Sequence, residues 1–224
     1  MGKGMIRKWL RTGIWTFLLL FPVVAFASRF DREILFVGSQ YTYVREMTNR
    51  NDHPDIDIWL KYCGLDNQKK FLRTGEGYSY CAAFGCYVIY VTYKAHNMKS
   101  PFFHSAGCAD ILTRAKKDKY TYRVITPKQI FIGAAYLEPA DVIIWSHNKN
   151  SENSWNGHFG FNYYQINNNE FKSLEANTIN KNDASGQREQ AKGSKNVGGV
   201  YYKNRKLGLG TTEFPVEGII RIQD

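Results

Sequence analysis

The first half of the chain carries hydrophobic residues at intervals of three and four positions, which is the spacing of one face of a helix. This spacing predicts a helix over 33–47 and another over 105–117. Between them, Pro54 opens a third helix that stops at Gly64, because proline suits the first helical position and glycine the position after the last. The first half of the chain is therefore expected to be mainly helical.

A strongly apolar segment lies in the middle of this helical half. Residues 80–95 (YCAAFGCYVIYVTYKA) are hydrophobic almost all round, which is typical of a buried helix or a buried strand. The length of 16 residues favours a helix, although the β-branched and aromatic content favours a strand. Residues 66–79, which hold charges and two glycines, are predicted to form a loop.

The periodicity changes in the second half, where short runs typical of strands are bounded by glycine or asparagine. These runs are Tyr120–Ile125, Asp141–Trp145, His158–Gln165, Phe171–Ala176, Gly199–Tyr202 and Gly218–Ile222. Residues 178–196 are polar and predict a long loop, which in a compact domain is often functional. Helices followed by strands in one unit predict an α+β fold.

The N-terminus has the pattern of an export signal. Residues 1–13 are basic, residues 14–27 are apolar, and Ala25-Phe26-Ala27 forms a small-x-small cleavage site before Ser28. An uncleaved membrane anchor is the alternative, but the apolar run of 14 residues contains Pro22 and falls short of the roughly 18–20 that a spanning helix needs. We expect a signal peptide over 1–27, a single catalytic domain over 28–224, an exported (periplasmic or extracellular) protein and no stable membrane span after cleavage.

Composition and charge narrow the class of protein further. The 224 residues are 43% hydrophobic, which excludes a wholly disordered chain. The formal net charge is +10, and removal of the signal peptide takes away four positive charges and leaves +6. This charge favours an anionic partner such as a cell wall or a membrane surface, or only a soluble surface. The basic residues are scattered, so we expect no nucleic-acid partner.

One of the four cysteines has the setting of a nucleophile. Cys81 falls at the predicted start of the central helix, where the helix dipole lowers a thiol pKa and free N–H groups can stabilise an oxyanion. Cys86 falls mid-helix and is expected to be buried and inert. An even number of cysteines in an exported chain suggests disulfides, and Cys63 and Cys108 are the two left over, so a pairing between them is a hypothesis. The alternative for Cys81 is a small core residue.

A nucleophilic cysteine needs a base and an orienting group. His158 is the best candidate of five histidines, because it begins a predicted strand with Gly157 before it and Gly160 close behind, so that another group can approach. A structural histidine is the alternative. On the next predicted strand, Glu175 and Asn177 are two residues apart and are expected to share one face, so either can hold the imidazole.

These residues lie in motifs that resemble the CHAP family, the cysteine- and histidine-dependent amidohydrolases/peptidases. The match covers roughly residues 33–222 in order. The motifs are Tyr80-Cys81-Ala82-Ala83-Phe84, Glu138-Pro139-Ala140-Asp141-Val142, Gly157-His158-Phe159-Gly160 and Glu175-Ala176-Asn177-Thr178. The sequence departs from the family at Tyr80, where many members have Trp, at Ala140, where they have the turn glycine, and at Gly85-Cys86. We expect Tyr80 to alter the substrate groove and Ala140 to reshape its turn.

The resemblance implies a papain-like fold, with helices that carry Cys81 packed on an antiparallel sheet that carries His158. It implies a cysteine peptidase or amidase that cuts an amide bond of peptidoglycan through a thioester. In that reaction Glu175 orients His158 and Asn177 is the second choice, and no cofactor or metal is needed. His104 and Cys108, four residues apart, allow an alternative reading as metal ligands. A secreted protease acting on proteins, an acyl transferase and an inactive wall-binding module are the competing functions.

Overall fold

The computed structural model describes most of the chain from residue 30 onward. The described ranges are 30–48, 50–146, 157–179, 197–209 and 215–223. The predicted signal peptide and nearly all of the predicted loop 178–196 lie outside them.

The described residues form a mixed α+β fold, as predicted. The helices are α1 (Asp31–Ser39), α2 (Pro54–Tyr62), α3 (Asn67–Thr74), α4 (Cys81–Ala95), α5 (Cys108–Lys117) and α6 (Pro127–Phe131). The strands are β1 (Tyr122–Ile125), β2 (Val142–Ser146), β3 (Gly157–Gln165), β4 (Glu170–Ile179), β5 (Gly198–Lys206) and β6 (Val216–Ile222). They form one antiparallel sheet in the order β1-β6-β2-β3-β4-β5.

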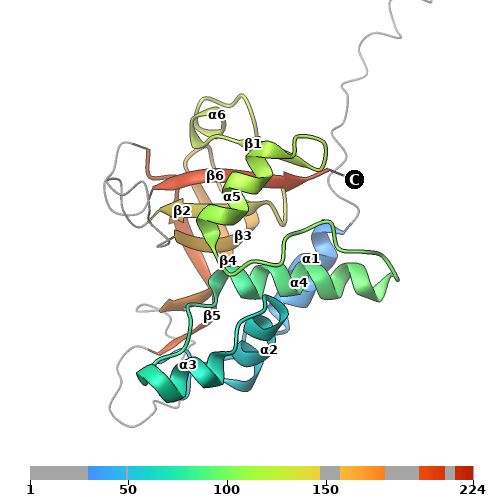
Figure 1. The fold of residues 1–224 in the computed structure, drawn as a ribbon. Coiled ribbons are helices and arrows are strands. Elements are labelled where there is room, and N and C mark those ends of the chain that lie inside the picture. Colours follow the sequence, from blue (N-terminus) through green and yellow to red (C-terminus); the bar gives the residue numbers. More distant parts are fainter. Residues whose placement is uncertain (1–29, 49, 147–156, 180–196, 210–214, 224) are drawn as a thin grey trace, which may run out of the picture.

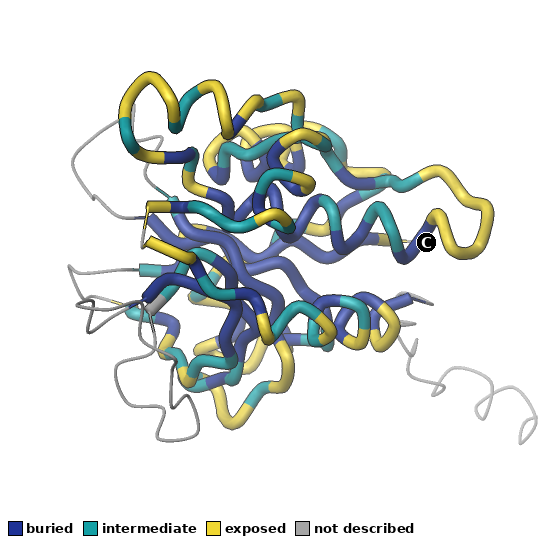
Figure 2. Tube along the Cα trace, turned by 90° about the horizontal axis from the view of Figure 1, so that it is seen from below, coloured by how far each residue is buried: buried dark blue, intermediate teal, exposed yellow. Residues whose placement is uncertain are grey.

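The larger core lies between the sheet and helices α1, α4 and α5. Helix α4 packs against β3 and β4 and is itself covered by α1 and α2, while α5 packs against β1, β2, β3 and β6. Figure 1 shows α5 crossing in front of the sheet, with α4 and α1 below it. In Figure 2 the strands and the inward sides of the helices form one buried interior, and exposed residues gather at turns and outer helix surfaces.

A second, smaller core covers the opposite face of the sheet. Alternation along β2 sends Val142 and Ile144 into the larger core and Ile143 and Trp145 into the smaller one, as the period of two in a strand requires. Helix α6 contributes Ile130 to this second core. Both faces of β2 are therefore buried, which explains why its sequence is apolar without a break.

The helix predicted over the apolar segment is confirmed, and its close packing depends on one small residue. Helix α4 begins at Cys81, and a Cβ on Gly85 would lie 2.0 Å from the ring of Phe159 on β3. Only glycine allows the helix to approach the strand this closely. The packing against Phe159 thus explains the glycine at this position.

Two expectations for the helical half are wrong. The predicted loop 66–79 contains α3, because the Asp66 side chain accepts a hydrogen bond from Lys69 N–H at 2.8 Å and Gly75 ends the helix with φ 73°. The predicted helix 33–47 stops at Ser39, and Arg45 then forms an isolated antiparallel β-bridge with Gly199 of β5. Pairing with a distant strand overrides the local helical pattern there.

Helix α6 was not predicted, although its first turn carries a capping box. The Thr126 hydroxyl accepts from Gln129 N–H, the Gln129 side chain accepts from Thr126 N–H, and Pro127 takes the first helical position.

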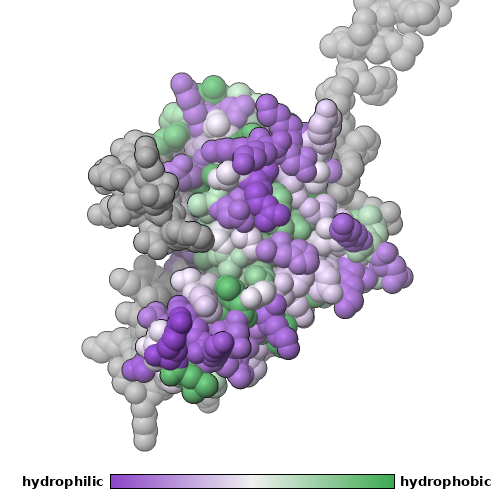
Figure 3. Space-filling model, viewed as in Figure 1, coloured by the Kyte–Doolittle hydropathy of each residue, from purple (hydrophilic) through white to green (hydrophobic). Residues whose placement is uncertain are grey.

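In the part of the chain that the structure describes, no helix is long and apolar enough to cross a membrane. On the face seen in Figure 3, hydrophobic residues form small groups separated by hydrophilic ones.

Candidate active site

Cys81 is the first residue of α4, and its helix start is anchored by a buried tyrosine. The preceding residue, Tyr80, gives α4 no side-chain cap, and its hydroxyl donates instead to the carboxylate of Glu46 at 3.0 Å. The same hydroxyl accepts a hydrogen bond from the backbone N–H of Asn177. Tyr80 is fully buried, so the expectation that it alters the substrate groove is wrong: it ties the nucleophile's helix to two other segments.

The start of α4 lies where strands β3 and β4 separate. The two strands pair from Gln165 opposite Phe171 as far as Gly160 opposite Glu175. Beyond Glu175, β4 bulges and continues beside β5 alone, with Asn177 at φ 55°. The backbone N–H of Phe159 lies past the last β3–β4 pair and donates to the sulfur of Cys81. The bulge thus opens the sheet where the thiol meets it.

His158 and Glu175 lie on neighbouring strands, and their side chains are hydrogen-bonded. The Nε2 atom of His158 lies 2.9 Å from Oε2 of Glu175, and both side chains are buried. Gly160 lies opposite Glu175, and a Cβ there would come within 2.7 Å of the Glu175 side chain. Since Nε2 faces the carboxylate, Nδ1 is the nitrogen left to interact with the Cys81 thiol, whose pKa His158 lowers.

Glu175 is held by two residues that sequence reasoning missed. Arg205 on β5 donates from Nε to Glu175 Oε1 at 2.7 Å and forms a second contact with Oε2. The hydroxyl of Ser173, two residues before Glu175 on the same strand, also donates to Oε1. The sequence carries a signal for Ser173, since residues two apart share a strand face, but the pairing with Arg205 depends on a register that local pattern does not fix.

The surroundings of these three residues favour a thiolate–imidazolium pair. Hydrogen bonds from the Cys108 thiol, His158 and the Phe159 backbone hold the pKa of Cys81 well below its ordinary value, although burial opposes this. Burial also acts to lower the pKa of His158, but its bonds to Cys81 and Glu175 raise it to about 9. Against burial, Arg205 and His158 lower the pKa of Glu175 to about 2. All three shifts favour the charged form of the group concerned.

The regular alternation that predicted a shared face for Glu175 and Asn177 is interrupted at Asn177. Alternation holds only in a regular strand, and the bulge between Glu175 and Thr178 interrupts it. His158 is hydrogen-bonded to Glu175. The backbone of Asn177 takes the left-handed conformation, and its N–H donates to the hydroxyl of Tyr80. Its contribution is to the shape of the bulge.

The cysteines are arranged differently from the pairing expected between Cys63 and Cys108. All four are free thiols, and the sulfur of Cys108 lies 3.9 Å from that of Cys81. The thiol of Cys86 is hydrogen-bonded with Cys63 and donates to the carbonyl of Ser105 at 3.2 Å. Cys86 is fully buried and its pKa is raised well above the ordinary value by burial and by Cys63, in keeping with its expected inertness.

The described histidines other than His158 have structural partners. His53 accepts from Asp55 N–H at the start of α2, and His96 lies 2.6 Å from a carboxylate oxygen of Glu33. His104 stacks against the ring of Tyr62 and precedes α5, so it and Cys108 do not share a helix. Within the described ranges, no group of three or more His, Cys, Asp or Glu side chains is arranged to hold a metal ion. His147 lies outside the described residues.

Comparison of the chain with protein-family models, with curated proteins and with solved structures finds no match. The case for a function therefore depends on the chemistry of the site and on the motifs of the sequence.

Proposed function

We propose that this protein is a secreted cysteine amidohydrolase or endopeptidase that cleaves an amide bond of bacterial peptidoglycan through a thioester acyl-enzyme. The observation that carries the proposal is the contact of a helix-start thiol, Cys81, with an imidazole, His158, that is held by a buried carboxylate, Glu175. A nucleophile, a base and an orienting group within hydrogen-bond reach of one another are the requirements of covalent catalysis.

The arrangement supports a papain-like architecture as the finer description of the fold. A helix carries the cysteine, and an antiparallel sheet carries the histidine and its orienting residue on adjacent strands. The choice of peptidoglycan as the substrate comes from the CHAP-like motifs, and the expected signal peptide is consistent with a substrate outside the cytoplasm. The excess of positive charge is consistent with an anionic wall.

In the first half of the reaction, the Cys81 thiolate attacks the carbonyl carbon of the scissile amide. The backbone N–H of Cys81, at the first position of α4, has no acceptor within the helix and is suited to stabilise the oxyanion. The His158 imidazolium then gives its proton to the leaving amine as the C–N bond breaks. A thioester on Cys81 and a neutral imidazole remain.

In the second half, neutral His158 takes a proton from water, and the hydroxide formed attacks the thioester carbon. Collapse of the tetrahedral intermediate releases the carboxylate product and restores the Cys81 thiolate. Glu175 fixes the orientation of the ring through Nε2 and stabilises its positive charge. Because the site is almost wholly buried, with Cys81 only 4% exposed, these charges interact more strongly than they would in water.

The decisive experiment is digestion of purified peptidoglycan by the mature chain, with products identified by mass spectrometry. Cys81→Ala is expected to abolish new amine and carboxylate ends, while Cys63→Ser, a change at another free thiol, is expected to retain them. Full activity in Cys81→Ala would overturn the mechanism. A soluble denatured protein as parallel substrate tests the alternative that the enzyme is a general secreted protease, and products extended by an added amine would reveal acyl transfer.

A further inference from the structure

One group beside the nucleophile lowers the pKa of Cys81 but takes no part in the bond-making steps of the proposed mechanism. Cys108 is the first residue of α5, is 2% exposed, and has its sulfur 3.9 Å from the sulfur of Cys81. A small apolar side chain would fill this position in the core equally well. A thiol placed against a reactive thiolate has a chemistry that an alanine or serine lacks.

The approach of the two sulfurs is a property of the fold around them. Each cysteine is the first residue of its helix, and their sulfurs are close together. The N-termini of α4 and α5 therefore converge, and they do so at the start of β3. The strand leaves space for this approach at Gly157, next to His158, because a Cβ there would lie 2.7 Å from Cβ of Cys108. The second thiol is therefore held against the nucleophile by two helices and a strand.

We propose that Cys108 is a resolving cysteine, and that oxidation of Cys81 is captured as a reversible Cys81–Cys108 disulfide. With a peroxide as oxidant, the Cys81 thiolate takes one peroxide oxygen to become a sulfenic acid, and the other oxygen leaves as water after protonation. The Cys108 sulfur then attacks the Cys81 sulfur, the S–S bond forms, and the sulfenic oxygen leaves as a second water. Two thiols are oxidised and one peroxide is reduced.

A low-molecular-weight disulfide leads to the same product by exchange. Attack by Cys81 gives a mixed disulfide and releases one thiolate, and attack by Cys108 on the Cys81 sulfur releases the other. A dithiol reductant reverses the reaction. Formation of the bond requires the sulfurs to close from 3.9 Å to about 2.05 Å.

The electrostatics of the pair sets the order of these events. In the reduced site, the hydrogen bond with Cys81 and burial raise the pKa of Cys108 well above its ordinary value, whereas the pKa of Cys81 is lowered. Cys81 is thus the thiol that meets the oxidant. Once its sulfur is a neutral sulfenic acid, the negative charge that suppresses ionisation of Cys108 is gone, and Cys108 becomes able to attack.

The second pair of thiols provides an internal control. Burial and the neighbouring Cys63 thiol raise the pKa of Cys86 well above its ordinary value, which is the opposite of the shift at Cys81 that begins the reaction. Under limited oxidation, the bond between Cys81 and Cys108 is expected to form before any bond between Cys63 and Cys86. Oxidation selective for the first pair separates a built-in reaction from general damage.

The experiment treats the reduced mature protein with one equivalent of hydrogen peroxide or oxidised glutathione. Free thiols are then alkylated and the cysteine peptides are identified by mass spectrometry. The expected result is a linked Cys81–Cys108 peptide that dithiothreitol restores to two thiols. Sulfinic acid on Cys81 with a free Cys108, or linkage of either residue to Cys63 or Cys86 first, would overturn the proposal.

Two variants sharpen the test. In Cys108→Ser and Cys108→Ala, Cys81 is expected to stop at a glutathione adduct after oxidised glutathione and to proceed to sulfinic acid after peroxide. When reductant is added after peroxide, the wild type should recover on the order of tenfold more activity than either variant. Cys63→Ser should recover as the wild type does. The activity comparison rests on the proposed function, whereas the peptide map does not, so a protein that is inactive on peptidoglycan can still confirm or refute the disulfide.

Discussion

Two buried carboxylates of the sheet are each paired with an arginine, and they differ in what the third partner is. Glu175 on β4 is paired with Arg205 on β5, and Asp141, just before β2, accepts two hydrogen bonds from Arg221 on β6, at 2.9 and 2.8 Å. Burial raises the pKa of Asp141 in spite of Arg221, whereas the pKa of Glu175 is lowered to about 2. The arginine lowers the pKa of its carboxylate in both pairs, yet the net shifts have opposite directions.

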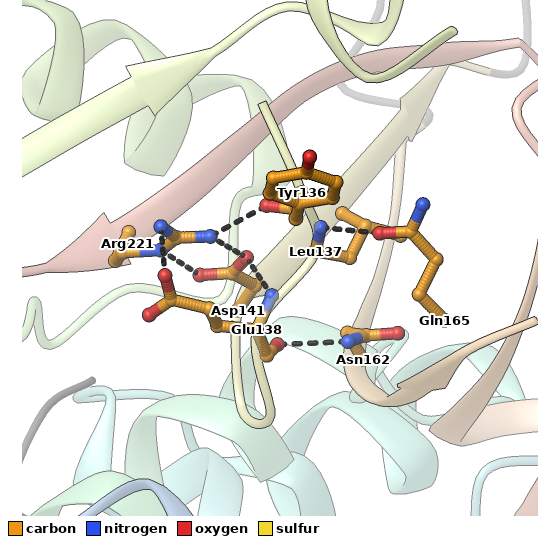
Figure 4. A network of polar contacts seen from close by, with 7 residues as sticks. All are labelled: Tyr136, Leu137, Glu138, Asp141, Asn162, Gln165 and Arg221. Carbon is orange, nitrogen blue, oxygen red and sulfur yellow. Dashed lines mark hydrogen bonds and ion pairs between the residues drawn. The ribbon is translucent and has the colours of Figure 1, made fainter. Parts of the chain in front are cut away.

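The imidazole contributes to the difference. His158, which can carry a positive charge, adds to the effect of Arg205 in lowering the pKa of Glu175, whereas burial of Asp141 outweighs the lowering by Arg221 and by the backbone N–H of Glu138. Figure 4 shows Arg221 bonded to Asp141, to Glu138 and to the carbonyl of Tyr136. Arg221 thus donates to carboxylate and carbonyl groups along the segment 136–141 and holds this segment in place. In our proposal the pair that contacts an imidazole supports the reaction, whereas the pair that contacts the segment 136–141 has a structural role.

The largest expected effect is on stability, in a comparison of the two arginines. Arg221→Met leaves Asp141 buried without its cation, so we expect a loss of about 3–5 kcal/mol in the free energy of unfolding. Arg205→Met leaves Glu175 with His158 as a cationic partner, so we expect a smaller loss of about 1–3 kcal/mol. Urea denaturation of the two variants measures the difference. Equal losses would mean that His158 does not compensate Glu175.

The second effect is on turnover. Glu175→Ala removes both the orientation and the charge stabilisation of His158. We therefore expect it to lower turnover on the order of tenfold or more beyond the loss in Asn177→Ala. This corresponds to a difference of at least about 1.4 kcal/mol in activation free energy. Glu175→Gln should be intermediate, because it keeps a hydrogen bond and loses the charge. Asp141→Asn, the matched change in the structural pair, should leave kcat of the folded protein unchanged. Circular dichroism confirms folding first, and greater damage in Asn177→Ala would reverse the assigned roles.

The pH profile should separate the two carboxylates again. The wild type is expected to lose activity as the pH rises through about 9, where His158 loses its proton. Removal of the Glu175 charge lowers the pKa of His158, so in Glu175→Gln this alkaline limb should move toward neutral pH, while in Asp141→Asn it should stay in place. Because the folded-state pKa of His158 is raised, its contribution to stability is complete below about 6.5 and is lost as the pH rises through about 9. An unmoved limb in Glu175→Gln would contradict the assignment.

Much of this comparison was open to sequence reasoning, and the part that was not depends on register. The thiol at a helix start, the histidine at a strand start and the acidic residue on the next strand follow from local pattern and motif, and the structure brings Cys81, His158 and Glu175 together. The clamp by Arg205 required knowledge that β4 pairs with β5 so that Phe171 lies opposite Arg205. No local signal fixes that register.

The bulge and the cysteine contacts were out of reach for a related reason. Alternation predicted that Asn177 would share a face with Glu175, but Asn177 adopts a left-handed conformation that ends the alternation. Elimination suggested a pairing of Cys63 with Cys108, but the convergence of α4 and α5 places Cys108 against Cys81. Both errors came from treating one chain segment alone, where the outcome depends on how distant segments meet.

The smallest expected effect lies in the turn of the structural pair, where Ala140 stands in place of the glycine of the CHAP-like motif. The turn keeps a glycine-like shape: Ala140 has φ 60°, and its N–H donates to the carbonyl of Asn162 at 2.8 Å. The left-handed conformation costs alanine about 1–2 kcal/mol. Ala140→Gly removes this strain. It also raises the conformational entropy of the unfolded chain and removes a buried methyl group, and each of these lowers the free energy of unfolding by up to about 1 kcal/mol.

We therefore expect Ala140→Gly to change the free energy of unfolding by less than about 1 kcal/mol, and Ala140→Val to lower it by about 1–3 kcal/mol, because a β-branched residue is poorly accommodated at positive φ. If Arg221 holds the strained segment in place, the segment can relax in Arg221→Met, and Ala140→Gly should then be less favourable than in the wild-type background. A double-mutant cycle by urea denaturation measures this coupling. A coupling energy of zero would show that the Arg221 ion pair and the strained turn contribute to stability independently. It would contradict the idea that Arg221 holds the backbone of this segment in its strained conformation.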